Sequence, residues 1–457
     1  MKQLTLEQHR ARIENIQSAE QANRSYFRRK RIHDYLFAQA IYNLGDYPSP
    51  FSITPTEYDH TLLSDMAANG VKLIQIHEEW NDSIRHLGAT KFTCHDPAGM
   101  KEFVSLCHSL GMKVIPYAST GYFHEFDPDF EESFCRPNGS KLAQSHFSYR
   151  CCYSGSAEWR NYMLPRMMQI LDDYGFDGLY NDMGYDAWRI TRYNAIKRGS
   201  LDFTPPYDPT IEDLLSTVYG EIKRRGGIYK VHFDRNSAPP VGDKVYDYLW
   251  IGEAMENTPI GVGKNYEDYV IPCPDFGFNT SPENMNCDFD YHYARMIPFL
   301  QFPILTRGRP FEGKRVTEDV PYYGGKGPNS EYGFGLRALE YAKAHPNGPY
   351  IYSFWSSIPP LQGDYEAWCH YHTLYAPMVE ENSLVYIELR ESAEILSPLP
   401  EGIYASMFVN EEKYLVVSNF TGRDYTLTLA DAWTDRVTKK RANSFTVPNE
   451  KILFLKK

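Results

Sequence analysis

Short apolar segments alternate with longer amphipathic segments through the first half of the chain. The apolar segments, which we expect to be strands, are residues 37–44, 71–80, 112–123 and 176–184. The segments between them, which we expect to be helices, are residues 54–70, 96–111 and 156–175. This alternation is typical of parallel βαβ units. Strands that are apolar almost throughout fit a sheet that is covered on both faces.

The ends of the expected helices support this reading. Thr54 and Asp96 can each cap a helix, and each is followed directly by a proline, which suits a first helical turn. The first two helices end at Gly70 and Gly111, and a strand begins at once after each glycine. Four such units without a GxGxxG turn favour a closed (β/α)8 barrel over a dinucleotide-binding sheet.

The second half of the chain continues the alternation less regularly. Residues 209–227 predict a helix, and strands five and six are expected at 228–234 and 245–255. A Pro- and Tyr-rich loop to about residue 290 is expected to form part of a substrate cleft, since long loops within a barrel are commonly functional. The remaining expectations are a seventh helix and strand within 290–308, a helix at 332–348 and an eighth strand at 349–357.

The two ends of the chain differ from the middle. Residues 3–30 are polar and predict a surface helix that ends in the basic run 28–31. From about residue 384, short alternating segments separated by turn residues predict antiparallel strands, including a hairpin that turns at 421–424. The expected domains are an N-terminal helical segment at 1–34, a catalytic barrel at 35–380 and a C-terminal β-sandwich-like domain at 384–457.

Composition narrows the classes of function. The net charge of −12 argues against a nucleic-acid binder, which normally presents a basic face. Aromatic residues make up 15% of the chain, with 36 Tyr, 25 Phe and 7 Trp. Flat rings cover the apolar faces of sugars, and phenol and indole groups bond to hydroxyls, so this content suits a carbohydrate site.

Other signals point away from metal sites and membranes. No pair among the eight cysteines has CxxC spacing, so we expect thiols in a large chain that does not need disulfides. His370 and His372 stand two residues apart on an expected helix, which directs them to different faces. We expect no metal, no cofactor and no membrane span. The N-terminus lacks a signal-peptide core, which predicts a cytoplasmic protein, although a secreted protein without its signal would read the same.

In an α/β barrel, catalytic groups lie at the C-terminal ends of the strands. Acidic and aromatic residues gather at these ends. From strand two onward they include His77, Glu78, Trp80, Tyr117, Ser119, Asn181, Asp182, His232, Asp234, Arg235, Trp250, Glu253 and Trp355. Two carboxylates astride a bond are what glycoside hydrolysis needs.

Asp182 and Glu253 are the candidate pair. Asp182 ends a strongly apolar strand, and Glu253 follows Gly252 at the end of strand six. The alternatives are a helix-capping role for Asp182 and a salt-bridged role for Glu253. Asp234 is the rival acid, and Arg235 beside it would hold a carboxylate ionised.

The placement of an aspartate after strand four and of an acid after strand six resembles that in the retaining α-glycosidases. These enzymes have a (β/α)8 barrel and a C-terminal β-domain. The α-galactosidase, dextranase and endo-α-N-acetylgalactosaminidase types belong to this group. The resemblance implies that Asp182 is the nucleophile and Glu253 the general acid/base, without a cofactor. It covers residues 35–457 as architecture and not as a close sequence match.

We therefore expect a retaining glycoside hydrolase that acts on an α-linked sugar in an oligosaccharide, polysaccharide or glycoside. The expected substrate-binding residues are Glu78, Trp80, Tyr117, Asn181, His232, Asp234, Arg235, Trp250 and Trp355. Transfer to another sugar, hydrolysis with inversion, and a barrel that binds carbohydrate without cleaving it remain open. The sugar, the linkage and the oligomeric state are not predicted.

Overall fold

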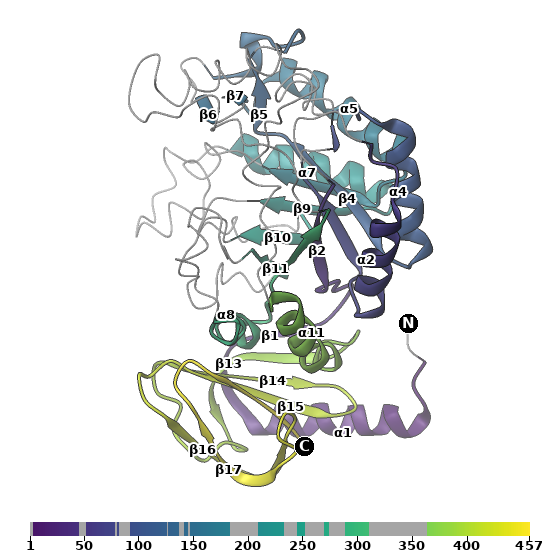
Figure 1. Ribbon diagram of the computed structural model, residues 1–457. Helices are drawn as coiled ribbons and strands as arrows, with labels where there is room; N and C mark the ends of the chain where they lie inside the picture. The colour runs from purple at the N-terminus through teal and green to yellow at the C-terminus, as the bar shows by residue number, and fades with distance from the viewer. Residues whose placement is uncertain are drawn as a thin grey trace.

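The computed structural model describes residues 3–44, 52–77, 80–81, 92–125, 127–136, 141–144, 147–182, 209–232, 245–251, 269–273, 288–309 and 363–457. These residues form a parallel barrel and an antiparallel sheet that packs beneath it in the view of Figure 1. Within the described part, no helix is both long and apolar enough to cross a membrane.

Eight parallel strands form the barrel. They are β2 (Gln39–Asn43), β3 (Leu73–Ile76), β4 (Lys113–Ser119), β8 (Gly178–Asp182), β9 (Ile228–His232), β10 (Tyr248–Ile251), β11 (Tyr269–Pro272) and β12 (Leu305–Gly308). From β2 to β11 each barrel strand pairs with the barrel strand that follows it, and β12 pairs with β2. The gap between β11 and β12 is crossed by the backbone N–H of Ile304, which donates to the carbonyl of Pro272 at 2.9 Å. The (β/α)8 fold class predicted from the sequence is confirmed.

Helices alternate with these strands. The described ones are α2 (Glu57–Ala68), α4 (Pro97–Ser109), α5 (Ala157–Tyr174), α7 (Pro209–Arg224), α8 (Phe289–Met296) and α11 (Asp364–Tyr375). Asp96 caps α4 as expected, accepting a hydrogen bond from the Gly99 N–H. Thr56 and not Thr54 caps α2, because Thr56 and Asp59 each accept a hydrogen bond from the other's backbone N–H.

Strands seven and eight differ from the prediction. The seventh strand is β11, in a segment that we expected to be a loop, and the eighth is β12, at the end of the segment expected to hold the seventh helix and strand. β11 has only four residues, which is too short for a periodic pattern to stand out among the prolines and tyrosines around it. The helix expected at 332–348 and the strand expected at 349–357 lie outside the described residues.

The N-terminal segment also differs from the prediction. Helix α1 (Leu6–Ala22) ends earlier than expected, and residues 23–31 form strand β1 (Asn23–Arg31). β1 pairs antiparallel with β13 (Leu384–Ser392), so the basic run 28–31 lies on an edge strand and not on a helix. Pairing with an existing sheet overrides the weak helix preference of this segment, and charge on an edge strand discourages further pairing.

The C-terminal strands form a single antiparallel sheet with β1. They are β13, β14 (Ile403–Val409), β15 (Lys413–Asn419), β16 (Tyr425–Asp435), β17 (Arg441–Val447) and β18 (Ile452–Lys456), in the order β1-β13-β14-β15-β18-β16-β17. The hairpin predicted at 421–424 is wrong, because β18 lies between β15 and β16. The domain boundaries given above stay a prediction.

The segment between β1 and β2 crosses the N-terminal ends of the barrel strands. The hydroxyl of Tyr248 donates to the Asp34 carbonyl at 2.7 Å and accepts from the Leu36 N–H at 2.9 Å. The hydroxyl of Tyr269 bonds in the same way to both backbone groups of His33. Four backbone groups of this segment are thereby satisfied at the start of β10 and β11.

A buried ion pair ties β12 to the segment after β2. Arg309 donates to both carboxylate oxygens of Asp59, with its Nη2 at 2.8 Å from Oδ2, and Asp59 is fully buried. Tyr42 donates to the same carboxylate at 2.6 Å. Burial alone would raise the pKa of Asp59, but the hydrogen bonds from Arg309, Thr56 and Tyr42 and the Arg309 charge lower it below its usual value.

Replacing Asp59 by Asn is expected to lower the free energy of unfolding by roughly 3–5 kcal/mol, because the Arg309 charge would remain buried without its partner. Urea unfolding at pH 7 measures this loss. The matched control is Asp172→Asn, which breaks the exposed Asp172–Arg225 pair (3.1 Å) and should cost less than about 1 kcal/mol. Equal costs for the two variants would contradict this account of the buried pair.

Candidate active site

Asp182 lies at the C-terminal end of β8, the fourth strand of the barrel. Its side chain is 23% exposed, whereas that of His232 is 9% exposed. The hydroxyl of Tyr117 donates to Asp182 Oδ2 at 3.3 Å, and Nδ1 of His232 lies 3.5 Å from Oδ1. The carboxylate is therefore held between residues of the two strands that flank β8 and still reaches solvent.

The backbone of Asp182 is held as firmly as its side chain. Ser119 on β4 donates through Oγ to the Asp182 carbonyl at 2.7 Å. The same Oγ accepts hydrogen bonds from the N–H groups of Gly121 and Tyr122. The register pairs Asp182 with Ser119 on one side and with His232 on the other. The strand end thus has little freedom to move relative to its neighbours.

Aromatic rings surround the carboxylate. The rings of His232 and Trp250 meet edge to face with centroids 4.3 Å apart. Tyr180 meets Trp250 at 5.3 Å and Tyr117 at 5.9 Å, again edge to face. Tyr180 and Asp182 are two residues apart on one strand, so their side chains face the same side. We call Tyr117, Tyr180, Asp182, His232 and Trp250 the Asp182 site.

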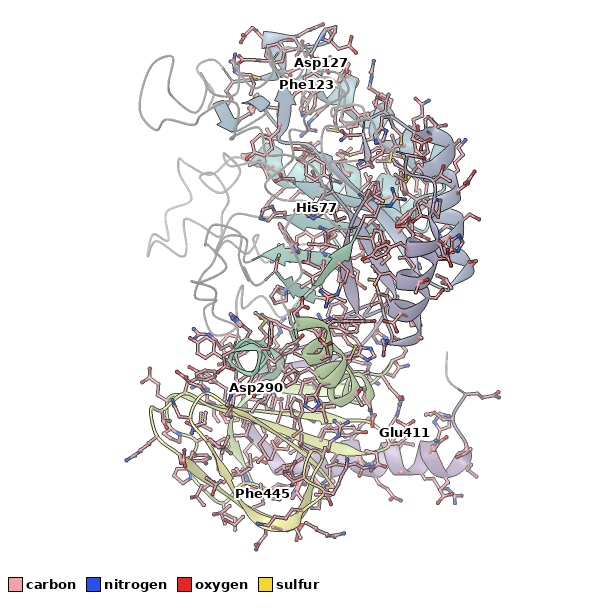
Figure 2. All side chains as sticks on the ribbon, viewed as in Figure 1. His77, Phe123, Asp127, Asp290, Glu411 and Phe445 are labelled. Carbon is pink, nitrogen blue, oxygen red and sulfur yellow. The ribbon has the colours of Figure 1, made fainter. Side chains whose placement is uncertain are left out.

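A polar layer lies deeper in the barrel. The fully buried Lys230 donates through Nζ to Gln39 Oε1 at 2.8 Å, and Gln75 Nε2 lies 3.1 Å from His77 Nε2. Burial lowers the pKa of Lys230 well below its usual value. Burial, and then the Lys230 charge, lower the pKa of His77 to about 3, against an opposing effect of Asp182. His77, seen among the barrel strands in Figure 2, is neutral at pH 7.

Two residues expected to bind substrate have other roles in the structure. Trp80 is fully buried and donates through Nε1 to the Tyr117 carbonyl at 3.0 Å, so it packs the core and cannot stack on a sugar. Asn181 is buried on the other side of β8 from Asp182. Its side chain bonds to Thr120 and Tyr229, which supports the strand end and leaves no route to a ligand.

Tyr117, His232 and Trp250 are brought together around Asp182, as expected. The other candidates lie outside the described residues: Glu78, Asp234, Arg235, Glu253 and Trp355. Their place in the site stays a prediction.

Sequence reasoning missed Tyr180, Lys230 and Gln39 as parts of the barrel interior, whereas His77 was expected at the end of strand two. A usable signal was present for two of them. Tyr180 precedes Asp182 by two residues and Lys230 precedes His232 by two, so the strand period of two places each pair on one face. A lysine in an expected interior position usually indicates a polar site.

Comparison with known proteins finds similar folds but no similar sequences. No family model matches the chain, and no curated protein matches it. Among solved structures, a noncanonic maltogenic α-amylase AmyB from Thermotoga neapolitana has a TM-score of 0.52 at 11% identity, covering 92% of this chain and 99% of its own. A family GH13_31 enzyme has a TM-score of 0.54 at 11% identity, with coverages of 93% and 99%.

An inactive double mutant of MutB in complex with isomaltulose is similar to the same degree. Its TM-score is 0.54 at 9% identity, with coverages of 93% and 99%. At such low identities the likeness shows the architecture, a parallel barrel with a C-terminal β-domain. The finer resemblance to the α-galactosidase, dextranase and endo-α-N-acetylgalactosaminidase types stays a prediction.

The His77 imidazole is expected to stay neutral from pH 8 down to pH 5. Its pKa is lowered from 6.5 to about 3 in the folded protein, so between about pH 6.5 and pH 5 the unfolded chain binds a proton that the folded chain does not. His77 therefore makes the fold less stable as the pH falls below about 6.5.

Imidazole ¹⁵N shifts across a pH series measure this property, with the urea-unfolded protein as the control that titrates near about 6.5. A His77→Gln variant should also lose less stability between pH 7 and pH 5 than the wild type. Titration of His77 near pH 6–7 in the folded protein would contradict its burial beside Lys230.

Proposed function

We propose that the protein is a glycoside hydrolase that cleaves an α-linked sugar with retention, and that Asp182 is its nucleophile. The observation that carries this proposal is a partly exposed carboxylate at the end of the fourth barrel strand, oriented by Tyr117 and His232 among aromatic rings. The C-terminal ends of barrel strands are where enzymes of this fold place their catalytic groups.

The arrangement suits attack by Asp182 on an anomeric carbon. An ionised carboxylate that accepts a hydrogen bond from Tyr117 is held in one orientation, and this reduces the cost of reaching the reactive geometry. Trp250 and Tyr180 give the site an apolar lining. This lining is itself buried, and it excludes water from one side of the carboxylate.

A second carboxyl group must protonate the leaving oxygen and then activate water. Glu253, two residues after β10, is our assignment for this role, and Asp234, two residues after β9, is the rival. Both follow strands that come after β8 in the barrel order, and these strands contribute His232 and Trp250 to the Asp182 site. Glu78, Arg235 and Trp355 are proposed to contact the substrate.

The solved structures suggest which sugars to try first. Those with this architecture include an AmyP complex with maltose, at a TM-score of 0.50 and 11% identity, and the MutB complex with isomaltulose. Both ligands are α-linked disaccharides. We therefore place α-glucosides and α-glucans first for this chain, with α-galactosides and α-N-acetylgalactosaminides next.

Two other functions use the same site. A transglycosylase would need only an acceptor sugar that outcompetes water at the second step. A carbohydrate-binding barrel would use the aromatic lining without cleavage. The role of Asp182 separates these functions, because an enzyme loses turnover without this carboxylate and a binding barrel loses only part of its affinity.

The test uses a panel of α-glucosides, α-glucans, α-galactosides and α-N-acetylgalactosaminides. Wild-type protein is expected to hydrolyse at least one of them. Asp182→Asn is expected to reduce the rate by at least about 10³-fold, as loss of a nucleophile does. Proton NMR follows the reaction, and the first anomer released should be the α form. The control is Asp172→Asn, a surface carboxylate that pairs with Arg225.

A near-normal rate for Asp182→Asn would remove Asp182 as nucleophile, whatever the substrate. Release of the β anomer first would show inversion. If no sugar of the panel is cleaved and sugars still bind, with modestly weaker binding by Asp182→Asn, the protein is a carbohydrate-binding barrel.

Tyr117→Phe is expected to lower kcat about tenfold with little change in KM. The loss of one hydrogen bond to a charged group is worth about 1.5 kcal/mol, and about 1.4 kcal/mol is a factor of ten. Tyr365→Phe is the matched control, because it removes a tyrosine hydroxyl that donates to Asp65, 2.7 Å away, outside the site. Equal kinetics for Tyr117→Phe and wild type would show that the hydroxyl does not orient Asp182.

A further inference from the structure

A small antiparallel sheet lies between β4 and α5 at the C-terminal end of the barrel. It consists of β5 (Tyr122–His124), β6 (Lys141–Gln144) and β7 (Phe147–Cys151), with the short helix η2 (Glu132–Phe134) beside it. It occupies the top of the molecule in Figure 1, and Figure 2 labels Phe123 and Asp127 there. We call residues 120–156 the insert.

Two cysteines face each other at the base of the insert. Cys135 follows η2 and Cys152 follows β7, and the two residues form an antiparallel bridge. The Tyr153 N–H donates to the Phe134 carbonyl at 2.8 Å, one residue beyond each cysteine. The cysteines are therefore a non-hydrogen-bonded pair, the type in which side chains lie closest, with Cα atoms about 4.5 Å apart.

This placement meets the requirements of a disulfide. A disulfide joins residues whose Cα atoms are about 4.4–6.8 Å apart, and both side chains are thiols in this structure. A hydrogen bond with the Cys152 side chain is the largest cause that lowers the pKa of the Cys135 thiol, in agreement with this placement. The pairing therefore puts the two cysteines within the range that a disulfide requires.

The surroundings also suit thiol chemistry. The hydrogen bond with Cys152 and the Arg150 charge lower the pKa of Cys135, against the opposing effects of burial and of Glu132. Arg150 is fixed nearby by two hydrogen bonds to Glu132, at 2.9 and 3.0 Å. Cys152 is only half-buried, so an oxidant can reach it.

We propose that Cys135 and Cys152 are a redox-active dithiol that forms a reversible disulfide with a small-molecule disulfide as the oxidant. The Cys152 thiolate attacks the oxidant and releases one thiol. The Cys135 thiolate then attacks the Cys152 sulfur and releases the second thiol. Two protein thiols lose two electrons and two protons, and one small disulfide becomes two thiols.

The Cys135–Cys152 pair is connected to the Asp182 site through a chain of hydrogen bonds. The Cys152 N–H donates to the Gly121 carbonyl at 2.8 Å, and the Gly121 N–H donates to Ser119 Oγ, which in turn holds the Asp182 carbonyl. A disulfide would close the base of the insert next to these bonds. The insert of the oxidised protein should therefore exchange its amide hydrogens more slowly.

In the test, the protein is incubated in buffers of increasing oxidised-to-reduced glutathione ratio. The samples are then quenched with acid, alkylated and analysed by peptide mass spectrometry. The expected result is the loss of two thiols and the appearance of a peptide that links Cys135 to Cys152. Dithiothreitol should restore both thiols.

Two single variants serve as controls. Cys151→Ser removes the neighbouring thiol, whose side chain points to the other face of its strand, and should leave the disulfide intact. Cys369→Ser removes another half-buried thiol, on α11, and should also leave it intact. Cys152→Ser should abolish the linked peptide.

Alkylation of both Cys135 and Cys152 at every glutathione ratio would overturn the proposal. So would a stable glutathione adduct on Cys152 that Cys135 does not displace, or a disulfide through Cys151. These outcomes are read in the wild-type protein, so they hold even if a variant fails to fold, and none of them depends on hydrolase activity.

Discussion

The register that joins β4, β8 and β9 is the constraint on which the site depends. Parallel pairing sets Ser119, Asp182 and His232 at one level of the barrel. A shift of one residue would turn the Asp182 side chain away from the interior, because the side-chain period of a strand is two. Tyr117 and His232 can reach the carboxylate only in the observed register. Backbone hydrogen bonds in three strands therefore determine where the Asp182 carboxylate lies.

The C-terminal sheet supports this barrel from below in the view of Figure 1, where it packs against α8. Buried residues of β13, β14, β15 and β18 belong to the same apolar core as the barrel strands, and Ser406 donates to the Pro298 carbonyl at 2.5 Å. The N-terminal strand β1 completes that sheet before the chain enters β2. The two ends of the chain are thus joined in one sheet, which fixes the segment that crosses the base of the barrel.

Much of the fold could be predicted because long, capped elements leave a clear pattern. α4 has its cap at Asp96 and its terminal glycine at Gly111, and the strand after it is almost wholly apolar. The prediction failed where an element is very short or where tertiary pairing determines its secondary structure. β11 has four residues, and β1 is polar and becomes a strand only because β13 is available to pair with it.

In the candidate site, too, local sequence patterns identified some residues, and tertiary contacts determined the roles of others. Asp182 could be found because a carboxylate directly after an apolar strand is unusual, and the end of that strand was easy to locate. Trp80 could not be assigned, because an aromatic residue at a strand end has the same local sequence pattern whether it faces a ligand or the core. Its hydrogen bond to the Tyr117 carbonyl is a tertiary contact that no local pattern reveals.

The most direct test of Asp182 as a nucleophile is to trap the covalent intermediate. A fluorinated glycosyl fluoride of the cleaved sugar, which forms the glycosyl-enzyme quickly and releases it slowly, would be followed by digestion and peptide mass spectrometry. The account predicts one glycosyl unit on the peptide that carries Asp182. A label on another carboxylate, or active enzyme that turns over substrate and is never labelled, would contradict it.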